Sequence, residues 1–493
     1  MWRYPHCAEY RGCSSDEDVV TMPTAESRYD AVVVGSGPNG LAAAITLARE
    51  GKSVLVLEGA ETVGGGCRSA GLTLPGYLHD VCSAIHPLGV SSPFFRSLDL
   101  SPHGLEWVQP DVPLAHPLDD GTAVLVDRSV EKTCAGLGDD GEAYFSLMQP
   151  LSRDWLKLSS RLLGPVSLSP GMLPLTPFGL KAVRAAASLA RGLFEDEPAR
   201  ALFAGMSAHS IMPLEQRGSA AYGLLMCASA HAAGWPLARG GSQRIADALA
   251  GCLRGLGGEI RTSCPVENID ELPPHRATLL DVTPRQLLQM AGDRLSPAGY
   301  RKRLGEYKYG PAAFKVDWAL EAPIPWRAAG CSRAGTVHLG GTLEEIAAAE
   351  RAVHQGHVPE RPLVLLTQQT VFDPTRAPEG RHTAWAYCHV PHASGEDMTG
   401  KIEAQVERFA PGFGDRILER SVMRPADLEA FNPNNVGGDI AAGRMELRRM
   451  LMRYAYVTPL PGVYICSSWM PPGPGVHGMS GYNAARTALR DMR

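Results

Sequence analysis

Three glycines near the start of the chain have the spacing of a turn that holds phosphate. Gly35, Gly37 and Gly40 follow an apolar run at 31–34 and open an alanine-rich segment. A glycine-rich turn between a strand and a helix lets the backbone approach a pyrophosphate, and the helix N-terminus offers it free N–H groups and partial positive charge. The G-x-G-x-x-G spacing therefore predicts a dinucleotide site in this turn.

An acidic residue supports this interpretation. Glu58 closes the next apolar run, at the separation expected for an acid that binds the hydroxyls of a ribose. A βαβ unit with no ligand needs neither three glycines nor a terminal acid. The binding residues predicted from this unit are Gly35, Gly37, Pro38, Asn39, Gly40 and Glu58.

The elements that must position these residues come from both ends of the chain. Residues 31–34 and 53–58 have the pattern of buried strands, with a helix between them. The uncharged run at 31–48 is interrupted by glycines and a proline, so we expect strand, turn and helix rather than a membrane span. Further along, the pattern predicts a helix after Gly241, strands at 264–269, 277–282 and 462–466, and a last helix after Gly478.

Composition excludes several classes of protein. The chain has 493 residues and a net charge of −5, so no basic excess points to nucleic acid. None of its 11 cysteines forms a C-x-x-C pair, which favours a reducing cytoplasm over a disulfide scaffold, and we assign no metal site. Residues 1–27 lack the apolar core of a secretory signal, and we expect them to be a disordered extension.

Two later segments carry a more specific signal. Gly64-Gly-Gly-Cys-Arg68 follows Glu58 closely, and the chain ends with a Pro/Gly turn at 471–478 that leads into Gly481-Tyr-Asn-Ala-Ala485. Together with the first motif, these segments resemble phytoene desaturase-like FAD-dependent oxidoreductases of the amine oxidase superfamily. The nearest branch is that of pyridine nucleotide-disulfide oxidoreductase domain-containing protein 2. The resemblance covers residues 28–493.

The resemblance implies a fold and a cofactor. The fold is α/β: a Rossmann-type FAD-binding domain made of residues 28–100, 232–290 and 455–493, with a discontinuous α+β substrate domain made of 101–231 and 291–454. The further FAD-binding residues that it implies are Gly65, Gly66, Arg68, Val266, Gly475, Val476, His477 and Gly478. For Val266 a plain core valine is the alternative. Backbone N–H groups of the turn at 476–478 would face the flavin.

The catalytic residues are harder to assign. Lys315 begins an apparent strand of the substrate domain, and amine oxidases place a lysine near the flavin; a surface lysine at a strand edge is the alternative. His477 lies in the flavin turn, and the alternative is a side chain that points away. Weaker candidates are His86, His209, His231 and His389. The chain also departs from the pattern, since Ser467-Ser468 stand where many FAD folds have Gly-Asp.

The resemblance implies an FAD-dependent oxidoreductase that acts on a small apolar substrate, a lipid or a polyene, by desaturation, saturation or isomerisation. One alternative is a flavin amine oxidase, in which Trp469 and Tyr482 would form an aromatic cage. The other is a flavin-bearing regulatory or partner-binding protein. The electron acceptor stays unassigned.

A basic amphipathic stretch bears on location. In residues 178–194, Lys181, Arg184, Ser188 and Arg191 share one helical face. We expect a surface helix on the core of the substrate domain; a lid that makes peripheral contact with a membrane is the alternative.

Overall fold

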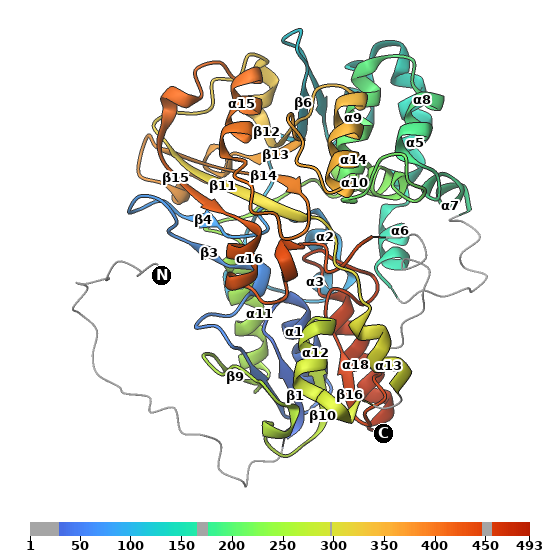
Figure 1. Cartoon of the computed structure of the whole chain (residues 1–493), viewed down its shortest axis with the longest axis vertical. Coiled ribbons are helices and arrows are strands. Elements are labelled where there is room, and N and C mark those ends of the chain that lie inside the picture. Colours follow the sequence, from blue (N-terminus) through green and yellow to red (C-terminus); the bar gives the residue numbers. More distant parts are fainter. Residues whose placement is uncertain (1–28, 165–175, 296–297, 446–455) are drawn as a thin grey trace.

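The computed structural model describes residues 29–164, 176–295, 298–445 and 456–493, so the predicted extension at 1–27 lies outside it. The described chain forms two lobes, each built on one large sheet (Figure 1). The lower lobe in Figure 1 holds both the first strand and the last helix. The two ends of the sequence therefore meet in one lobe.

The sheet of the lower lobe is parallel throughout. Its order is β16-β10-β1-β2-β9. The strands are β1 (Tyr29–Val34), β2 (Val54–Leu57), β9 (Glu259–Arg261), β10 (His275–Leu280) and β16 (Val463–Ile465). β1 lies in the centre, where Ala31 pairs with both Val54 and Ala277. All five strands come from the three ranges predicted for the cofactor domain.

In this lobe α1 (Pro38–Arg49) packs against both α11 (Gln243–Gly255) and α18 (Met479–Asp491). α18 lies directly against α1, and a Cβ at Gly481 would lie only 1.8 Å from the Asn39 carbonyl oxygen. Glycine at 481 is therefore what allows the last helix to reach the start of the first.

The sheet of the upper lobe is mixed, with order β15-β11-β14-β13-β12-β6-β7, and only β12 and β6 pair in parallel. Its strands are β6 (Val112–Pro117), β7 (Ala123–Val126), β11 (Ala312–Leu320), β12 (Ala334–Leu339), β13 (Val364–Thr367), β14 (His382–Val390) and β15 (Ile417–Met423). Helices packed in this lobe include α5 (Gly141–Arg153), α8 (Ala186–Leu193), α9 (Glu197–Ala208), α10 (Ala220–Ala232), α14 (Leu343–His354) and α15 (Thr399–Phe409). This is the predicted α+β architecture.

Shorter elements complete the described chain. The strands are β3 (Ser69–Ala70), β4 (His79–Asp80), β5 (Trp107–Val108) and β8 (Leu237–Ala238). The helices are α2 (Pro87–Ser91), α3 (Pro93–Arg96), α4 (Val130–Ala135), α6 (Trp155–Leu162), α7 (Thr176–Ala182), α12 (Pro284–Ala291), α13 (Ala298–Gly305) and α16 (Pro425–Phe431).

Two predicted elements differ from the structure. Residues 264–268 form no strand; they are irregular chain after β9 and lead into a 3-10 turn at Ile269–Glu271. The amphipathic stretch at 178–194 is not one helix, because α7 ends at Ala182 and α8 begins at Ala186. Arg191 forms an ion pair with Glu344 of α14, so this part of the basic face is anchored to the upper lobe.

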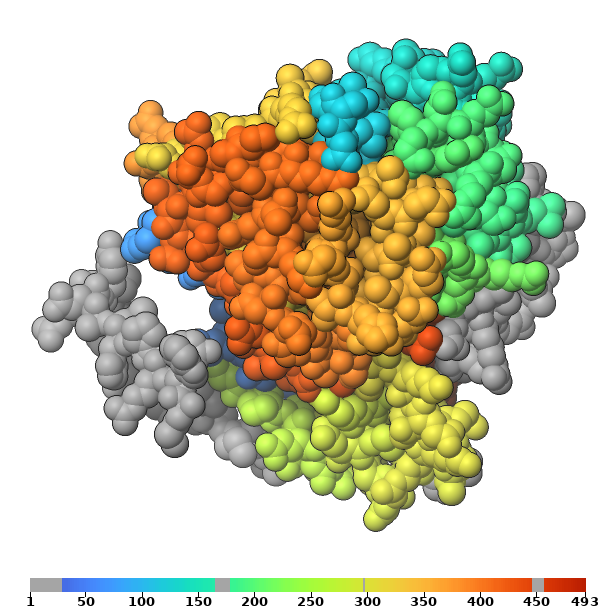
Figure 2. Space-filling view, turned by 45° about the horizontal axis from the view of Figure 1, so that its top comes forward, coloured from blue at the N-terminus to red at the C-terminus, as the bar shows by residue number. Residues whose placement is uncertain are grey.

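The surface in Figure 2 shows how the lobes divide one face of the molecule. Orange and yellow-orange residues of the upper lobe fill the centre and left, cyan and green residues of the same lobe lie at the top and right, and yellow-green residues of the lower lobe lie beneath them. Among the described residues, no helix has the length and apolar character needed to cross a membrane. Peripheral membrane contact stays a prediction.

Candidate active site

One cavity of about 1100 Å³ lies where the two lobes meet, and residues of both large sheets line it. It begins at the phosphate turn after β1 and reaches Trp385 and Tyr387 on β14 of the upper sheet. The predicted site residues that line it are Gly35, Gly37, Pro38, Asn39, Glu58, Gly65, Gly66, Arg68, Val266, Lys315, Gly475 and Val476. Gly40, His477 and Gly478 do not line it.

Glycines shape the phosphate end. Gly35 has φ +97°, a conformation that favours glycine, and a Cβ at Gly40 would lie 2.0 Å from the Gly35 carbonyl oxygen. Gly40 therefore serves the close packing of α1 on β1. A Cβ at Gly65 would come within 3.2 Å of Gly37 Cα, so side chains at these positions would fill the cradle. A backbone-lined cradle at a helix N-terminus fits a dinucleotide pyrophosphate.

Two carboxyl groups flank this turn. Glu58 accepts hydrogen bonds from the Ser36 N–H at 2.8 Å and from the Ser36 hydroxyl at 2.6 Å. Asp281 follows β10, and its Oδ2 accepts the N–H of Gly40 at 3.1 Å. Burial, together with the nearby Glu58 carboxylate, raises the pKa of Asp281 to about 7. Motif reasoning missed Asp281, because only the sheet order brings the end of β10 beside the turn.

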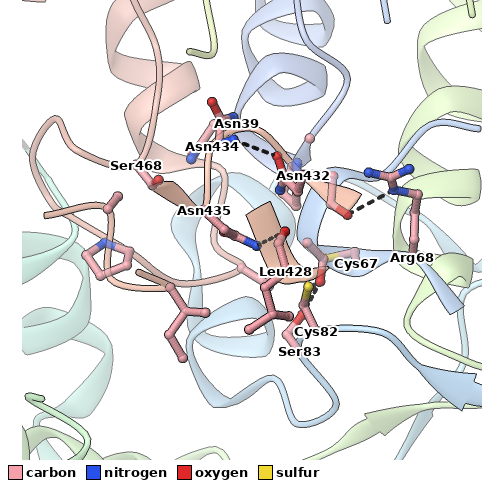
Figure 3. A pocket seen from close by; sticks show the side chains of 18 of the residues that line it. Asn39, Cys67, Arg68, Cys82, Ser83, Leu428, Asn432, Asn434, Asn435 and Ser468 are labelled. Atoms are coloured by element: carbon pink, nitrogen blue, oxygen red, sulfur yellow. Dashed lines mark hydrogen bonds between the residues drawn. The ribbon is translucent and has the colours of Figure 1, made fainter. Parts of the chain in front are cut away.

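The middle of the cavity joins three segments that are distant in sequence (Figure 3). Arg68 donates to the Gly65 carbonyl at 3.1 Å and to the Phe431 carbonyl at 2.9 Å, and its guanidinium lies 4.1 Å from the centre of the Phe431 ring. Asn434 donates to the main-chain oxygen of Asp281 at 3.0 Å. The loop at 432–435 thus lines the site, and its three asparagines, Asn432, Asn434 and Asn435, were the one available sequence signal.

Two thiols also line this region. Cys67 and Cys82 come from neighbouring segments, and both form part of the cavity wall (Figure 3). Burial raises the pKa of Cys67 to about 12, although a hydrogen bond with the Ser83 hydroxyl acts in the opposite direction. Because the thiolate is the reactive form, this thiol is poorly suited to disulfide exchange.

The C-terminal turn contributes less than expected. Pro474, Gly475 and Val476 line the cavity, but the N–H of His477 donates to the Gly475 carbonyl. The His477 ring is buried, and its Nδ1 accepts the N–H of Met479 at 3.0 Å. Its burial lowers the pKa of His477 to about 4. The ring therefore caps α18 instead of facing the cavity, in agreement with the alternative of a side chain that points away.

Lys315 is not the surface lysine at a strand edge that the sequence left open as an alternative. It lies on β11, an interior strand of the upper sheet, and is 2% exposed. Its ammonium donates to Asp317 Oδ2, and the other Asp317 oxygen lies 3.5 Å from His79 Nδ1. The surface-edge alternative is wrong, because Lys315 is a buried, paired ammonium in the cavity wall.

The far end of the cavity is apolar and aromatic. Its lining includes Ile211, Met226, Trp235, Leu365, Trp385 and Tyr387. Trp469 is not part of it, because its indole donates to the Val282 carbonyl at 2.8 Å. Tyr482 lies on α18 against Phe94. The predicted cage of Trp469 and Tyr482 is therefore wrong, and other aromatic residues, such as Trp385 and Tyr387, line the far end of the cavity.

Comparison with known proteins agrees with this architecture. Residues 33–99 match the family model of the NAD(P)-binding Rossmann-like domain. The chain is 26% identical to pyridine nucleotide-disulfide oxidoreductase domain-containing protein 2 of Mus musculus, over 94% of each chain. It is 23% identical to a limonene dehydrogenase polypeptide of Castellaniella defragrans, over 94% of this chain and 95% of that one.

Among solved structures, putrescine oxidase with bound putrescine superposes with a TM-score of 0.61 at 19% identity, covering 94% of this chain and 99% of that chain. At that identity the likeness concerns the fold. The predicted fold class and the predicted resemblance are both confirmed. The chain is an oxidoreductase that is similar over nearly its whole length to pyridine nucleotide-disulfide oxidoreductase domain-containing protein 2, and it shares its fold with putrescine oxidase.

Proposed function

We propose that the chain binds FAD and transfers hydride between that flavin and an apolar substrate. The observation that carries this proposal is the continuous cavity that runs from the phosphate turn to the apolar end of the upper sheet. Such a cavity holds a long dinucleotide and a second molecule in line. A pyridine nucleotide alone would leave the Arg68 and C-terminal turn segments without a ligand.

The chain's own residues would bind and orient the cofactor. The turn at Gly35–Gly37 and the start of α1 receive the pyrophosphate, and Glu58 receives ribose hydroxyls. Arg68 adds positive charge beside the phosphates, and the main chain of Gly475 and Val476 closes the flavin end. The flavin supplies the hydride chemistry itself, while the protein supplies orientation and excludes water.

The apolar lining of the far end supports an apolar substrate. Ile211, Met226 and Leu365 offer no charge to a ligand. The relative named as part of a limonene dehydrogenase agrees with a hydrocarbon-like substrate. Within this proposal, desaturation, saturation and isomerisation remain the reactions to be separated by experiment.

A flavin amine oxidase is the second candidate. Trp385 and Tyr387 stand at the substrate end, and putrescine oxidase shares the fold. Against it, the Asp317 carboxylate is already paired with the Lys315 ammonium, which lies 6.0 Å from the centre of the Trp385 ring, so this carboxylate is not free to bind a cationic amine.

Anaerobic reduction tests these alternatives. The purified, flavin-loaded protein would be mixed with polyenes, acyl lipids and amines, and bleaching of the flavin absorbance followed. We expect bleaching by a polyene or lipid. Bleaching by amines alone would favour the second candidate. A loaded protein that no donor bleaches, but that binds another protein, would favour the regulatory alternative.

A further inference from the structure

His209, one of the weaker candidates from the sequence, lines the cavity. It directly follows α9 and is half-buried. Its Nε2 lies 3.0 Å from Nε2 of His338, and its ring packs edge-on against Trp235. Its Nδ1 has no hydrogen-bond partner in the described part of the chain, and this atom is not buried away from the cavity. Nδ1 is thus the nitrogen that a ligand can reach.

Both rings of this pair are uncharged at neutral pH. Burial lowers the pKa of His209 to about 3, and burial also holds the pKa of His338 well below its usual range. A neutral imidazole carries one N–H and one bare nitrogen. In the contact between the two Nε2 atoms, one ring must therefore donate and the other must accept.

The surroundings of His338 decide which ring donates. Its Nδ1 is buried, has no partner among the described residues and faces Gly205, where an added Cβ would lie 2.8 Å away. A buried N–H without an acceptor is rarer and costlier than an unpaired acceptor. The proton of His338 therefore belongs on Nε2, which donates to His209. His209 must then carry its own proton on Nδ1, as a donor toward the cavity.

Other groups that line the cavity are polar, and its charged side chains Lys315 and Asp439 already have hydrogen-bond partners. Thr336 and Thr367 face each other across β12 and β13, and neither hydroxyl has a hydrogen-bond partner among the described residues. The ammonium of Lys315 is paired with Asp317. The Asp439 carboxylate already accepts the N–H groups of Gly310, Ala441 and Gly443. A charged end group on the substrate would find no complementary partner among these residues.

We propose that His209, through its Nδ1–H, binds a neutral oxygen acceptor on an otherwise apolar substrate, and that His338 is the positioning residue that holds this tautomer. The proposal rests on the function proposed above and narrows its substrate class to molecules with a hydroxyl, ether or carbonyl oxygen. A pure hydrocarbon and an amine cation both lack an acceptor for this N–H, so we expect them to bind more weakly.

Four ligands that share one carbon skeleton test this class. Farnesol, farnesyl methyl ether, farnesene and farnesylamine would be titrated calorimetrically into protein whose FAD loading has first been measured. We expect the alcohol and the ether to bind about fivefold to tenfold more tightly than farnesene, the worth of one hydrogen bond. Failure to load FAD overturns the proposed function instead. Equal binding of farnesene, tightest binding of the amine, or no binding by any of the four overturns the inference.

Variants separate recognition from folding. His209→Phe keeps a ring against Trp235 and should lose the preference for oxygen while farnesene binds as before. His338→Gln still offers an amide N–H and should keep the preference, whereas His338→Leu should lose it. His357→Phe changes an exposed histidine and serves as the matched control. Preference retained in both His209→Phe and His338→Leu contradicts the assignment.

The tautomer of His209 can be measured in the wild-type protein. Nitrogen-15 spectra of the wild-type protein, labelled at histidine, distinguish Nδ1–H from Nε2–H. We expect the proton of His209 on Nδ1, with the resonance identified by its disappearance in His209→Phe or by its shift on addition of farnesol. A proton on Nε2 of His209 overturns the proposal.

Discussion

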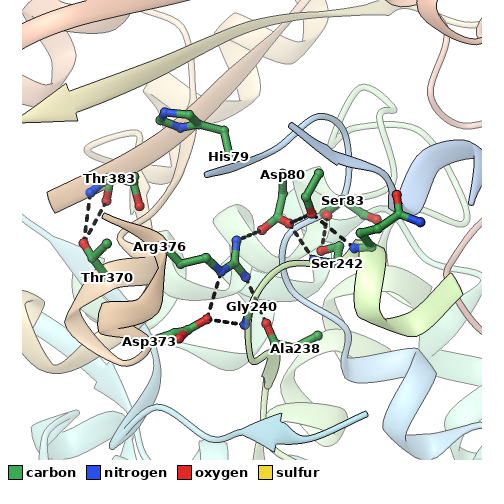
Figure 4. A network of polar contacts seen from close by, with 12 residues as sticks. His79, Asp80, Ser83, Ala238, Gly240, Ser242, Thr370, Asp373, Arg376 and Thr383 are labelled. Atoms are coloured by element: carbon green, nitrogen blue, oxygen red, sulfur yellow. Dashed lines mark hydrogen bonds and ion pairs between the residues drawn. The ribbon is translucent and has the colours of Figure 1, made fainter. Parts of the chain in front are cut away.

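Arg376 donates to Asp80 at 2.8 Å, and both side chains are completely buried (Figure 4). Arg376 also donates to Asp373 at 2.9 Å and to the main-chain oxygen of Ala238 at 3.0 Å. Asp80 in turn accepts the N–H of Ser242, at the start of α11. One guanidinium thus ties the upper lobe to the lower lobe. Burial opposes the charge on Asp80, but Arg376 and the Ser242 N–H hold its pKa below the usual range.

Removing this guanidinium should destabilise the protein strongly. Arg376→Met removes the guanidinium that bridges two buried carboxylates, Asp80 and Asp373, and we expect a loss of about 3–5 kcal/mol in the free energy of unfolding. Urea unfolding followed by tryptophan fluorescence measures it. Arg381→Met removes an exposed partner of Glu321 and should cost about 0–1 kcal/mol. Equal costs for the two variants would contradict the role given to Arg376.

Gly37→Ala should lose the cofactor without unfolding the lobe. A methyl group there would lie 3.0 Å from Asp281 Oδ2 and would intrude on the cradle. The flavin-to-protein ratio after purification measures the effect, with circular dichroism to confirm folding. Gly400→Ala, whose Cβ would meet nothing within 4 Å, should stay fully loaded. A fully loaded Gly37→Ala protein would refute the assignment of the phosphate turn.

Cofactor affinity should fall as the pH rises past neutrality. The Asp281 carboxyl lies beside the pyrophosphate cradle, and its charged or titratable neighbours are the Glu58 carboxylate and the Cys466 thiol. Burial raises the pKa of Asp281 to about 7. A bound dianionic pyrophosphate raises this pKa further, so binding above neutral pH takes up a proton. One linked proton weakens affinity by at most about tenfold per pH unit.

Quenching of FAD fluorescence at a series of pH values measures this linkage. Asp281→Asn keeps an oxygen for the Gly40 N–H but cannot titrate, so its affinity should not change with pH. Below neutrality Asp281 is already protonated, and the wild-type affinity should level off there. A wild-type affinity that does not change with pH, or an equal slope in Asp281→Asn, would rule out this linkage.

Two variants distinguish a structural role of Lys315 from a chemical one. Lys315→Met leaves Asp317 with only His79 nearby, and we expect about 3–5 kcal/mol of lost stability. The double variant Lys315→Met/Asp317→Asn removes both charges and should recover most of it. If Lys315 acts on the reaction, flavin reduction by substrate stays slow in the double variant. Normal rates in that variant would make Lys315 a structural residue.

The local part of the site could be predicted from sequence. The residues of this part lie close together along the chain: Gly35, Gly37, Glu58 and Arg68. Their spacing alone predicts the phosphate turn and the residues beside it. His477 shows the limit of this reasoning, because a histidine beside a helix N-terminus can use its ring to cap the helix. Val266 lines the cavity from irregular chain instead of a strand.

The remaining site residues depend on packing between distant segments. Asp281 reaches the phosphate turn only because β10 lies next to β1. The tautomer of His209 depends on His338, 129 residues away, and on the space left by Gly205. Spacing along the sequence does not predict contacts between such distant segments. For this reason His209 received no more weight from the sequence than several other histidines.

The visible absorption spectrum of the purified protein tests the central claim most directly. The account predicts the two visible bands of oxidised flavin, with one FAD released per chain on denaturation. A protein purified without colour should gain these bands when FAD is added and the excess removed. A colourless protein that takes up no FAD, or one that binds only a pyridine nucleotide, would contradict the account.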